Sequence, residues 1–315
     1  MTNQIKAFSK ESYHKSEILL ELLSYQQEVA VIAMGEEHKE TRFFELIKYF
    51  EVENEQLGGA LTSSLEKFRK DSLMLDNLIK AEISGYNGET KAFQSLERLK
   101  CNNRIIKNIE LCNDTLRTEI DAIVITEKGI FIIEVKNTQK DVFIDESGDF
   151  YRASKYQKFD SNIANKMEVK ETLLREKLDA LGYSGIKIFP VVVFTNKYIE
   201  VQNKRRGLKT CFSSQLPYII DDWKSFEYLT NNDLEIIEKT LADVVASATF
   251  PMQFDTDSVK TNFIELMNNL ERAKNQTQKI KPFKNITEFF NSKVYKYAGV
   301  AAAAIVISSI SLLRK

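Results

Sequence analysis

The chain has 315 residues, a length that allows one large domain or two smaller ones. Its 43% hydrophobic content excludes a disordered protein. Because 44 basic and 45 acidic residues nearly cancel, it is not a polybasic protein that holds nucleic acid by bulk charge, although a local basic cleft stays possible. Its 3 cysteines, without CxxC spacing, support neither a disulfide framework nor a zinc site, and its 2 histidines leave few routes to histidine-based catalysis.

Residues 1–80 are expected to form a helical region, because apolar residues recur there at helical spacing. The breaks between two or three amphipathic helices are predicted near Gly35 and near Gly58-Gly59. One interpretation is a helical hairpin or coiled-coil-like surface for self-association or for a protein partner. The other is a helical prefix that packs on its neighbour.

Residues 84–250 are expected to form an α+β or mixed α/β domain, with its motifs between residues 84 and 200. A turn cluster at 84–88 opens this region. The expected helices are 89–100, 163–181 and 232–246, and the expected strands are 108–112, 119–126, 130–136, 141–144 and 186–194. The last strand, IKIFPVVVF, is almost continuously apolar, which is typical of a strand buried on both faces.

The C-terminal part is expected to contain a helix and a polar linker at 251–292, followed by a transmembrane anchor at 295–313. Residues 297–313 carry no charge and have about the length that crosses a bilayer. More lysines precede this segment than follow it, which predicts a cytoplasmic main body, and the polar N-terminus predicts no signal peptide. The alternative is a buried or amphipathic terminal helix.

Charged residues interrupt an otherwise apolar β-hairpin predicted at 118–137. Glu134 and Lys136 are two residues apart on one strand, so both side chains lie on the same face. A four-residue loop, Thr126–Gly129, pairs Ile125 with Ile130 and brings Asp121 to that face as well. A three-residue loop would place Asp121 on the opposite face.

Two neighbouring carboxylates repel each other unless a divalent cation lies between them. Asp121 and Glu134, with a backbone carbonyl, are therefore candidate ligands of Mg²⁺, with Mn²⁺ as a substitute. Metal-bound water can attack a phosphate, and Lys136 can orient that water or neutralise the charge that develops. The alternative from spacing alone is an ordinary hairpin with Glu134 and Lys136 paired in water.

These segments resemble the nuclease-related domain (NERD), a family of the PD-(D/E)XK superfamily of metal-dependent nucleases. The matching segments are Gly88-Glu89, Glu119-Ile-Asp121, Ile133-Glu-Val-Lys-Asn137 and Pro190-Val-Val-Val-Phe194. The resemblance implies a restriction-endonuclease-like core, a central mixed sheet flanked by helices. It also implies a catalytic set of Glu89 on the first core helix, Asp121 and Glu134 as metal ligands, and Lys136 as the catalytic lysine. Many members open the next helix with Asn-Pro-x-x-Gln, whereas residues 162–166 read Asn-Ile-Ala-Asn-Lys.

The sequence thus predicts a membrane-tethered, Mg²⁺-dependent nuclease that hydrolyses nucleic acid, with DNA favoured over RNA. The alternative is a catalytically inactive nuclease fold that acts at the membrane as a scaffold or nucleic-acid-binding module through its helices. The retained polar residues favour the enzyme, and the missing Asn-Pro-x-x-Gln pattern favours the scaffold. Basic runs are candidate phosphate contacts, but acidic neighbours make a solvated face the better interpretation for each. These runs are Lys91–Lys107, Lys155–Lys170 and Lys204-Arg205-Arg206.

Overall fold

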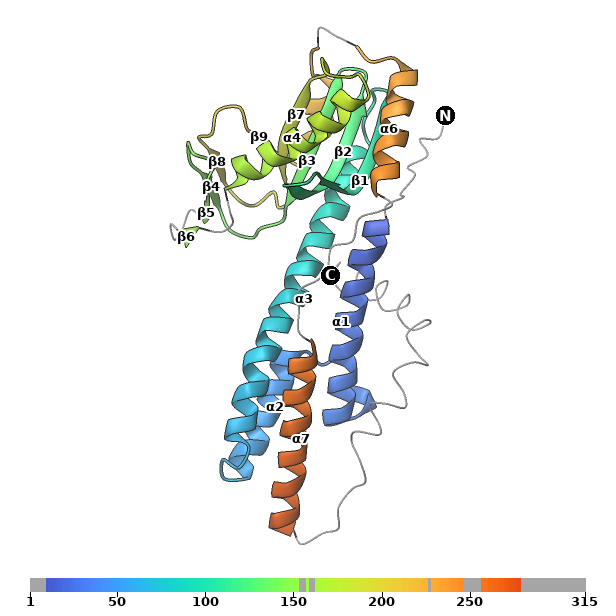
Figure 1. Ribbon diagram of the computed structural model, residues 1–315. Helices are drawn as coiled ribbons and strands as arrows, with labels where there is room; N and C mark the ends of the chain where they lie inside the picture. Colours follow the sequence, from blue (N-terminus) through green and yellow to red (C-terminus); the bar gives the residue numbers. More distant parts are fainter. Residues whose placement is uncertain (1–9, 153–156, 159–161, 226–227, 246–255, 279–315) are drawn as a thin grey trace. The chain divides into compact units, whose positions relative to one another are not determined.

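The computed structural model describes residues 10–152, 157–158, 162–225, 228–245 and 256–278 (Figure 1). The chain divides into two compact units. Met1–Lys15 and Ile83–Phe250 form the first, which we call the sheet unit, and Ser16–Glu82 and Pro251–Lys315 form the second, the helical unit. The expected α+β class, with a mixed sheet flanked by helices, is confirmed.

The helical unit is held together by an aromatic core. Its elements are α1 (Lys10–Met34) from Ser16 onward, the 3-10 helix Glu36–His38, α2 (Phe43–Gln56), α3 (Thr62–Leu96) as far as Glu82, and α7 (Thr256–Gln278). The Phe68 ring lies 5.8 Å from Phe50 and 5.5 Å from Phe263, so α2, α3 and α7 share one apolar centre. The predicted breaks are confirmed: Gly35 follows α1 with φ 106°, and Gly58 and Gly59 separate α2 from α3 with φ 61° and 85°.

The sheet unit is built on a 5-stranded sheet of order β1-β2-β3-β7-β9. The strands are β1 (Asn103–Cys112), β2 (Arg117–Thr126), β3 (Gly129–Lys136), β7 (Ile188–Phe194) and β9 (Lys209–Phe212). The pairs β1–β2 and β2–β3 are antiparallel, whereas β3–β7 and β7–β9 are parallel. The continuous apolar run that predicted a doubly buried strand forms β7, an inner strand of the sheet.

Helices cover both faces of this sheet. On one face, α4 (Ile163–Ala180) and α6 (Asn231–Val245) pack their leucines against isoleucines of β1, β2 and β3, and Figure 1 shows α4 lying across the sheet. On the other face, the end of α3 and the short α5 (Leu216–Asp221) cover Val124, Phe131 and Val191. The carboxyl end of β3 lies next to the start of α4 as a result, and this is where the predicted site residues are.

A second, 4-stranded sheet of order β6-β5-β4-β8 was not predicted. It consists of β4 (Val142–Ile144), β5 (Phe150–Arg152), β6 (Gln157–Lys158) and β8 (Val201–Asn203). Only β4 was expected from the sequence. The others have 2 or 3 residues, too few to show a periodicity.

The predicted turn at residues 84–88 is wrong, because α3 runs through it without a break. Tertiary contacts outweigh the low helix propensity of Gly85 and Gly88. The side-chain amide of Asn137, just beyond β3, donates to the Ser84 carbonyl at 2.8 Å, and the hydroxyl of Thr195 donates to the Asn137 carbonyl oxygen at 2.9 Å. Gly88 is needed for this approach, since a Cβ at position 88 would lie 2.6 Å from Cβ of Asn137.

Gly88→Ala is therefore expected to destabilise the sheet unit by about 1–3 kcal/mol through overpacking. Gly85→Ala is the matched control: it lies one turn earlier in α3, and a Cβ there meets nothing within 4 Å. That replacement is expected to be neutral or to stabilise by up to about 1 kcal/mol, because alanine is the better helix former. Urea unfolding followed by fluorescence of Trp223, the only tryptophan in the chain, measures both variants. Equal stability of the two would contradict the tight Gly88–Asn137 contact.

Among the residues that the structure describes, no helix is both long and apolar enough to cross a membrane. The segment 295–313, where the sequence predicts an anchor, lies outside the described residues.

Candidate active site

The β2–β3 hairpin brings Asp121 opposite Glu134, as the sequence predicts. Ile125 pairs with Ile130 and Ala122 with Ile133, which is the register expected from a loop at Thr126–Gly129. The ladder also includes Thr126 and Gly129, so the turn is tighter than the predicted four-residue loop. The Thr126 side chain closes it: its hydroxyl donates to the Gly129 carbonyl at 3.0 Å and accepts from the Lys128 amide at 3.1 Å.

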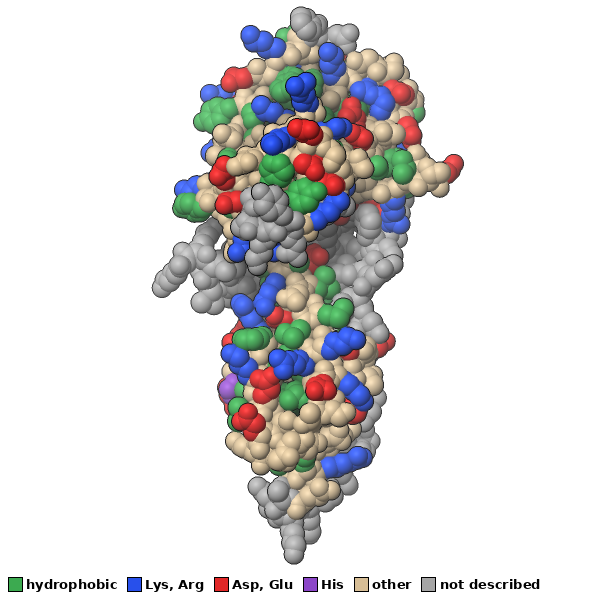
Figure 2. Space-filling model, turned by 90° about the vertical axis from the view of Figure 1, so that its left-hand side faces the viewer, with side chains coloured by type: hydrophobic (Ala, Val, Ile, Leu, Met, Phe, Trp, Pro, Cys, Tyr) green, Lys and Arg blue, Asp and Glu red, His purple; other side chains and the backbone are tan. Residues whose placement is uncertain are grey.

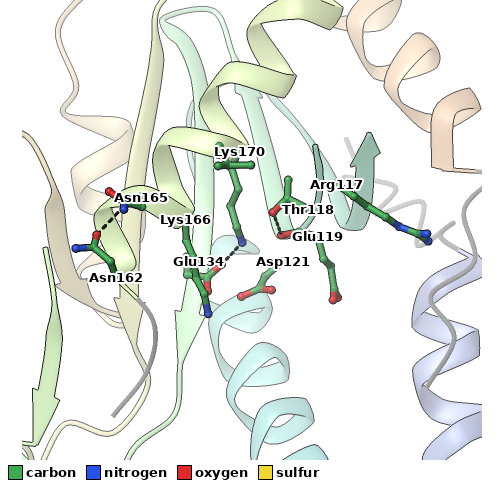
Figure 3. A pocket seen from close by; sticks show the side chains of 10 residues that line it. Arg117, Thr118, Glu119, Asp121, Glu134, Asn162, Asn165, Lys166 and Lys170 are labelled. Carbon is green, nitrogen blue, oxygen red and sulfur yellow. Dashed lines mark hydrogen bonds and ion pairs between the residues drawn. The ribbon is translucent and has the colours of Figure 1, made fainter. Parts of the chain in front are cut away.

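Both carboxyl groups of this hairpin contact donor groups of the protein. An oxygen of Asp121 accepts from the Val135 backbone amide at 2.6 Å. Glu134 is only 5% exposed. Its Oε1 lies 2.9 Å from Lys136 Nζ. Its Oε2 forms an ion pair with Lys170 Nζ, which reaches it from α4 (Figure 3). The Glu134–Lys136 pair exists, but in a buried place and not on a solvated hairpin.

The two carboxyl groups have opposite protonation tendencies. Burial, with help from the neighbouring charge of Glu134, raises the pKa of Asp121 to about 8. Glu89 also raises the pKa of Asp121, so the predicted fourth residue of the set lies near enough to act on it. Burial alone would raise the pKa of Glu134 too, but Lys170 and Lys136 outweigh it and hold that pKa below its usual range. At neutral pH, Glu134 is therefore ionised, whereas Asp121 retains a proton for much of the time.

A pocket of about 580 Å³ opens beside this pair. Asp121 and Glu134 line it together with three residues at the start of β2 and five residues of α4 and its cap. The additional lining residues are Arg117, Thr118, Glu119, Asn162, Asn165, Lys166, Val169 and Lys170. The strand side of the pocket carries the acidic groups together with Arg117, and the α4 side carries lysine and asparagine side chains, which suit a phosphate that contacts a cation.

The departure from Asn-Pro-x-x-Gln occurs at the first turn of α4, on the pocket wall. Asn162 caps the helix: its side-chain oxygen accepts from the Asn165 amide at 2.9 Å. Its amide group donates to the Ser147 carbonyl at 2.9 Å and to Asp149 at 3.0 Å. The asparagine therefore fixes α4 to the preceding turn, and Lys166, where the family pattern has Gln, lines the pocket.

Lys170 is the residue that the sequence interpretation missed. It was grouped with basic residues of a solvated face, yet it is 5% exposed and contacts Glu134. A signal for this was present: position 170 lies three residues after Met167 and four before Leu174, on the apolar face of α4. A lysine at the centre of an apolar face needs a buried counter-charge.

Three other residues of the basic runs form ion pairs with neighbouring acidic residues. Arg104 lies 3.3 Å from Glu238, Lys158 lies 2.9 Å from Asp149, and Arg205 lies 3.1 Å from Glu168. On the face seen in Figure 2, the basic and acidic side chains of the described residues are interspersed. Lys155 lies outside the described residues.

The donor set at the hairpin suits Mg²⁺. Within the described ranges, no group of three or more His, Cys, Asp or Glu side chains is placed to hold a metal. Mg²⁺ does not require one, since it commonly takes one or two carboxylates and completes its shell with water and substrate phosphate. Burial and the neighbouring charge of Glu134 raise the pKa of Asp121, and a divalent cation relieves both the burial of the charge and the repulsion. Asp121 and Glu134 fit such an ion as a two-carboxylate site.

A mixed sheet with a carboxylate pair and a lysine at one strand end is a candidate site for metal-assisted hydrolysis. Residues 84–195 match the family model of the nuclease-related domain, NERD, so the resemblance seen in the sequence is confirmed. The matched range contains Glu89, Asp121, Glu134, Lys136 and Lys170. No curated protein and no solved structure matches the chain.

Proposed function

We propose that the sheet unit is a divalent-metal-dependent nuclease that hydrolyses phosphodiester bonds, with DNA as the favoured substrate. One observation carries this proposal: Asp121, Glu134 and Lys136 meet at the end of one hairpin within the stretch that matches the nuclease-related domain. The DNA preference, rather than RNA, rests on the family resemblance.

In this proposal, Asp121 and Glu134 bind Mg²⁺ or Mn²⁺. When bound, the cation supplies a Lewis acid for the scissile phosphate and lowers the pKa of a coordinated water. Lys136, whose ammonium lies 2.9 Å from Glu134, neutralises negative charge that develops on the phosphate. Lys166 and Asn165, on the opposite pocket wall, are suited to orient the phosphate backbone.

We further propose that the C-terminal segment 295–313 attaches the protein to a membrane and leaves the main body in the cytoplasm. This part rests on the uncharged apolar run and on the lysines that precede it. The helical unit is then available for self-association or for a protein partner.

A second candidate function is a catalytically inactive nuclease fold that serves at the membrane as a scaffold or nucleic-acid-binding module. The observation that favours it is that both carboxylate oxygens of Glu134 already pair with lysines. The changed Asn-Pro-x-x-Gln pattern points the same way.

Cleavage assays separate these two functions. Full-length protein in mild detergent is incubated with labelled single-stranded DNA, duplex DNA and RNA, each with Mg²⁺, Mn²⁺ or EDTA. We expect metal-dependent cleavage that falls to background in Glu134→Ala and Lys136→Ala. Lys140→Ala, which removes the same charge from an exposed position four residues later, is the control and should retain activity. Absence of cleavage by folded wild-type protein under all metal conditions would favour the inactive module.

A further inference from the structure

Glu134 is a carboxylate with an ammonium group on each oxygen. Lys136 comes from the same strand and its side chain is 18% exposed, whereas Lys170 comes from α4 and its side chain is only 6% exposed. Lys136 belongs to the expected catalytic set. Lys170 has no role in it, and its position requires an explanation of its own.

The fold places Lys170 where its charge depends on the carboxylate pair. Its neighbours on the same face of α4, Met167 and Leu174, are buried in the core between α4 and the sheet. An ammonium beside such a core is costly unless it is paired, and the Glu134 carboxylate is its partner in this structure. The charge of Lys170 also acts on Asp121, the other carboxyl group of the pair. Lys170 therefore supplies, at the two proposed metal ligands, the positive charge that a metal ion would otherwise supply.

We propose that Lys170 is a built-in counter-cation of the carboxylate pair, which competes with the divalent metal for Glu134 and thereby sets the metal affinity of the site. The inference rests on the proposed metal-dependent function. A divalent cation that binds Glu134 adds positive charge next to the Lys170 ammonium, so Lys170 must leave Oε2. The pocket gives it room, because Lys170 lines the 580 Å³ space. There the ammonium can be hydrated or can contact a phosphate oxygen.

Mn²⁺ titration of the full chain by calorimetry tests the competition directly. We expect Lys170→Met to bind Mn²⁺ at least about tenfold more tightly than the wild type, because a like charge next to the ion is removed. Lys177→Met is the matched control, since it removes the same charge from the same helix seven residues later, and it should leave the affinity unchanged. Asp121→Asn identifies the site, and binding should be lost in it.

Thermal unfolding gives a second readout that does not depend on activity. Without metal, Lys170→Met is expected to melt below the wild type, because Glu134 loses its buried partner. Saturating Mn²⁺ should raise the melting temperature of Lys170→Met more than that of the wild type, since metal and lysine replace each other. If Lys170→Met does not fold without metal, Lys170→Gln, which keeps a neutral donor near Glu134, takes its place in both measurements with the same expected tightening.

The outcomes separate this inference from the proposed function. Mn²⁺ binding that disappears in Asp121→Asn but is equal or weaker in the Lys170 variants overturns the competition and leaves the metal site intact. Lack of Mn²⁺ binding by folded wild-type and Lys170-variant proteins overturns both. A melting temperature lowered in the Lys170 variants but raised no more by Mn²⁺ than in the wild type assigns Lys170 a purely structural role and contradicts the inference.

Discussion

The metal-free sheet unit is expected to lose about 3 kcal/mol of unfolding free energy between pH 5 and pH 8, because the pKa of Asp121 is raised to about 8 in the fold. In the unfolded chain this carboxyl group has an ordinary pKa and is ionised throughout that range. The folded state therefore binds more protons than the unfolded state, and stability falls as pH rises, by up to about 1.4 kcal/mol per pH unit. The decline should level off above pH 8.

The surroundings of Asp121 set its pKa and therefore the pH range over which stability falls. Burial raises the pKa of Asp121 most, Glu134 on β3 and Glu89 on α3 raise it further, and Lys170 on α4 lowers it. The pKa of Glu134 is held below its usual range, so its contribution to stability is lost as pH falls through and below the ordinary pKa of a glutamate, under the pH range of the decline.

Urea titrations in EDTA at several pH values measure this effect. The emission of Trp223 reports on the sheet unit, since its ring lies 4.5 Å from Phe189 and 5.7 Å from Phe131. Asp121→Asn keeps an acceptor for the Val135 amide and removes the titrating group, so its stability should be nearly independent of pH and should exceed that of the wild type at pH 8. A wild-type protein with flat stability from pH 5 to 8 would contradict the raised pKa.

Glu134→Gln is expected to destabilise the sheet unit by about 3 kcal/mol, because it leaves the buried ammonium of Lys170 without its ionic partner. For a unit of this size, such a loss lowers the melting temperature by roughly 10 °C. Removal of one member of a buried pair costs more than removal of both. The double variant Glu134→Gln with Lys170→Met should therefore recover much of the loss.

A surface pair provides the comparison for this variant. Glu168 contacts Arg205 at 3.1 Å, and their side chains are 62% and 36% exposed. Glu168→Gln should change stability by no more than about 0.5 kcal/mol, since water screens exposed pairs. If Glu134→Gln were as mild as Glu168→Gln, the Lys170–Glu134 contact would not be the buried ion pair described here.

Local patterns predicted much of this structure because each pattern reflects a local physical constraint. Helical periodicity predicted the helical elements and their glycine breaks, and the apolar run of β7 predicted a strand covered on both faces. The expected loop at Thr126–Gly129 predicted the pairing of Ile125 with Ile130, and this register places Asp121 opposite Glu134.

Contacts between segments distant in the sequence decided the rest. The helix α3 continues through Gly85 and Gly88 because Asn137 and Thr195, far along the chain, pack against it. The strands β5, β6, β8 and β9 form only because longer strands or each other provide partners for so few residues.

The sequence by itself therefore determined the fold class and the hairpin that carries Asp121, Glu134 and Lys136. The tertiary structure decided the electrostatic state of that site. Only the packing of α4 on the sheet brings Lys170 to Glu134, and only burial with Glu134 and Glu89 nearby raises the pKa of Asp121. Burial and the nearness of charges depend on how distant segments pack together, so they cannot be predicted from residue spacing along one strand.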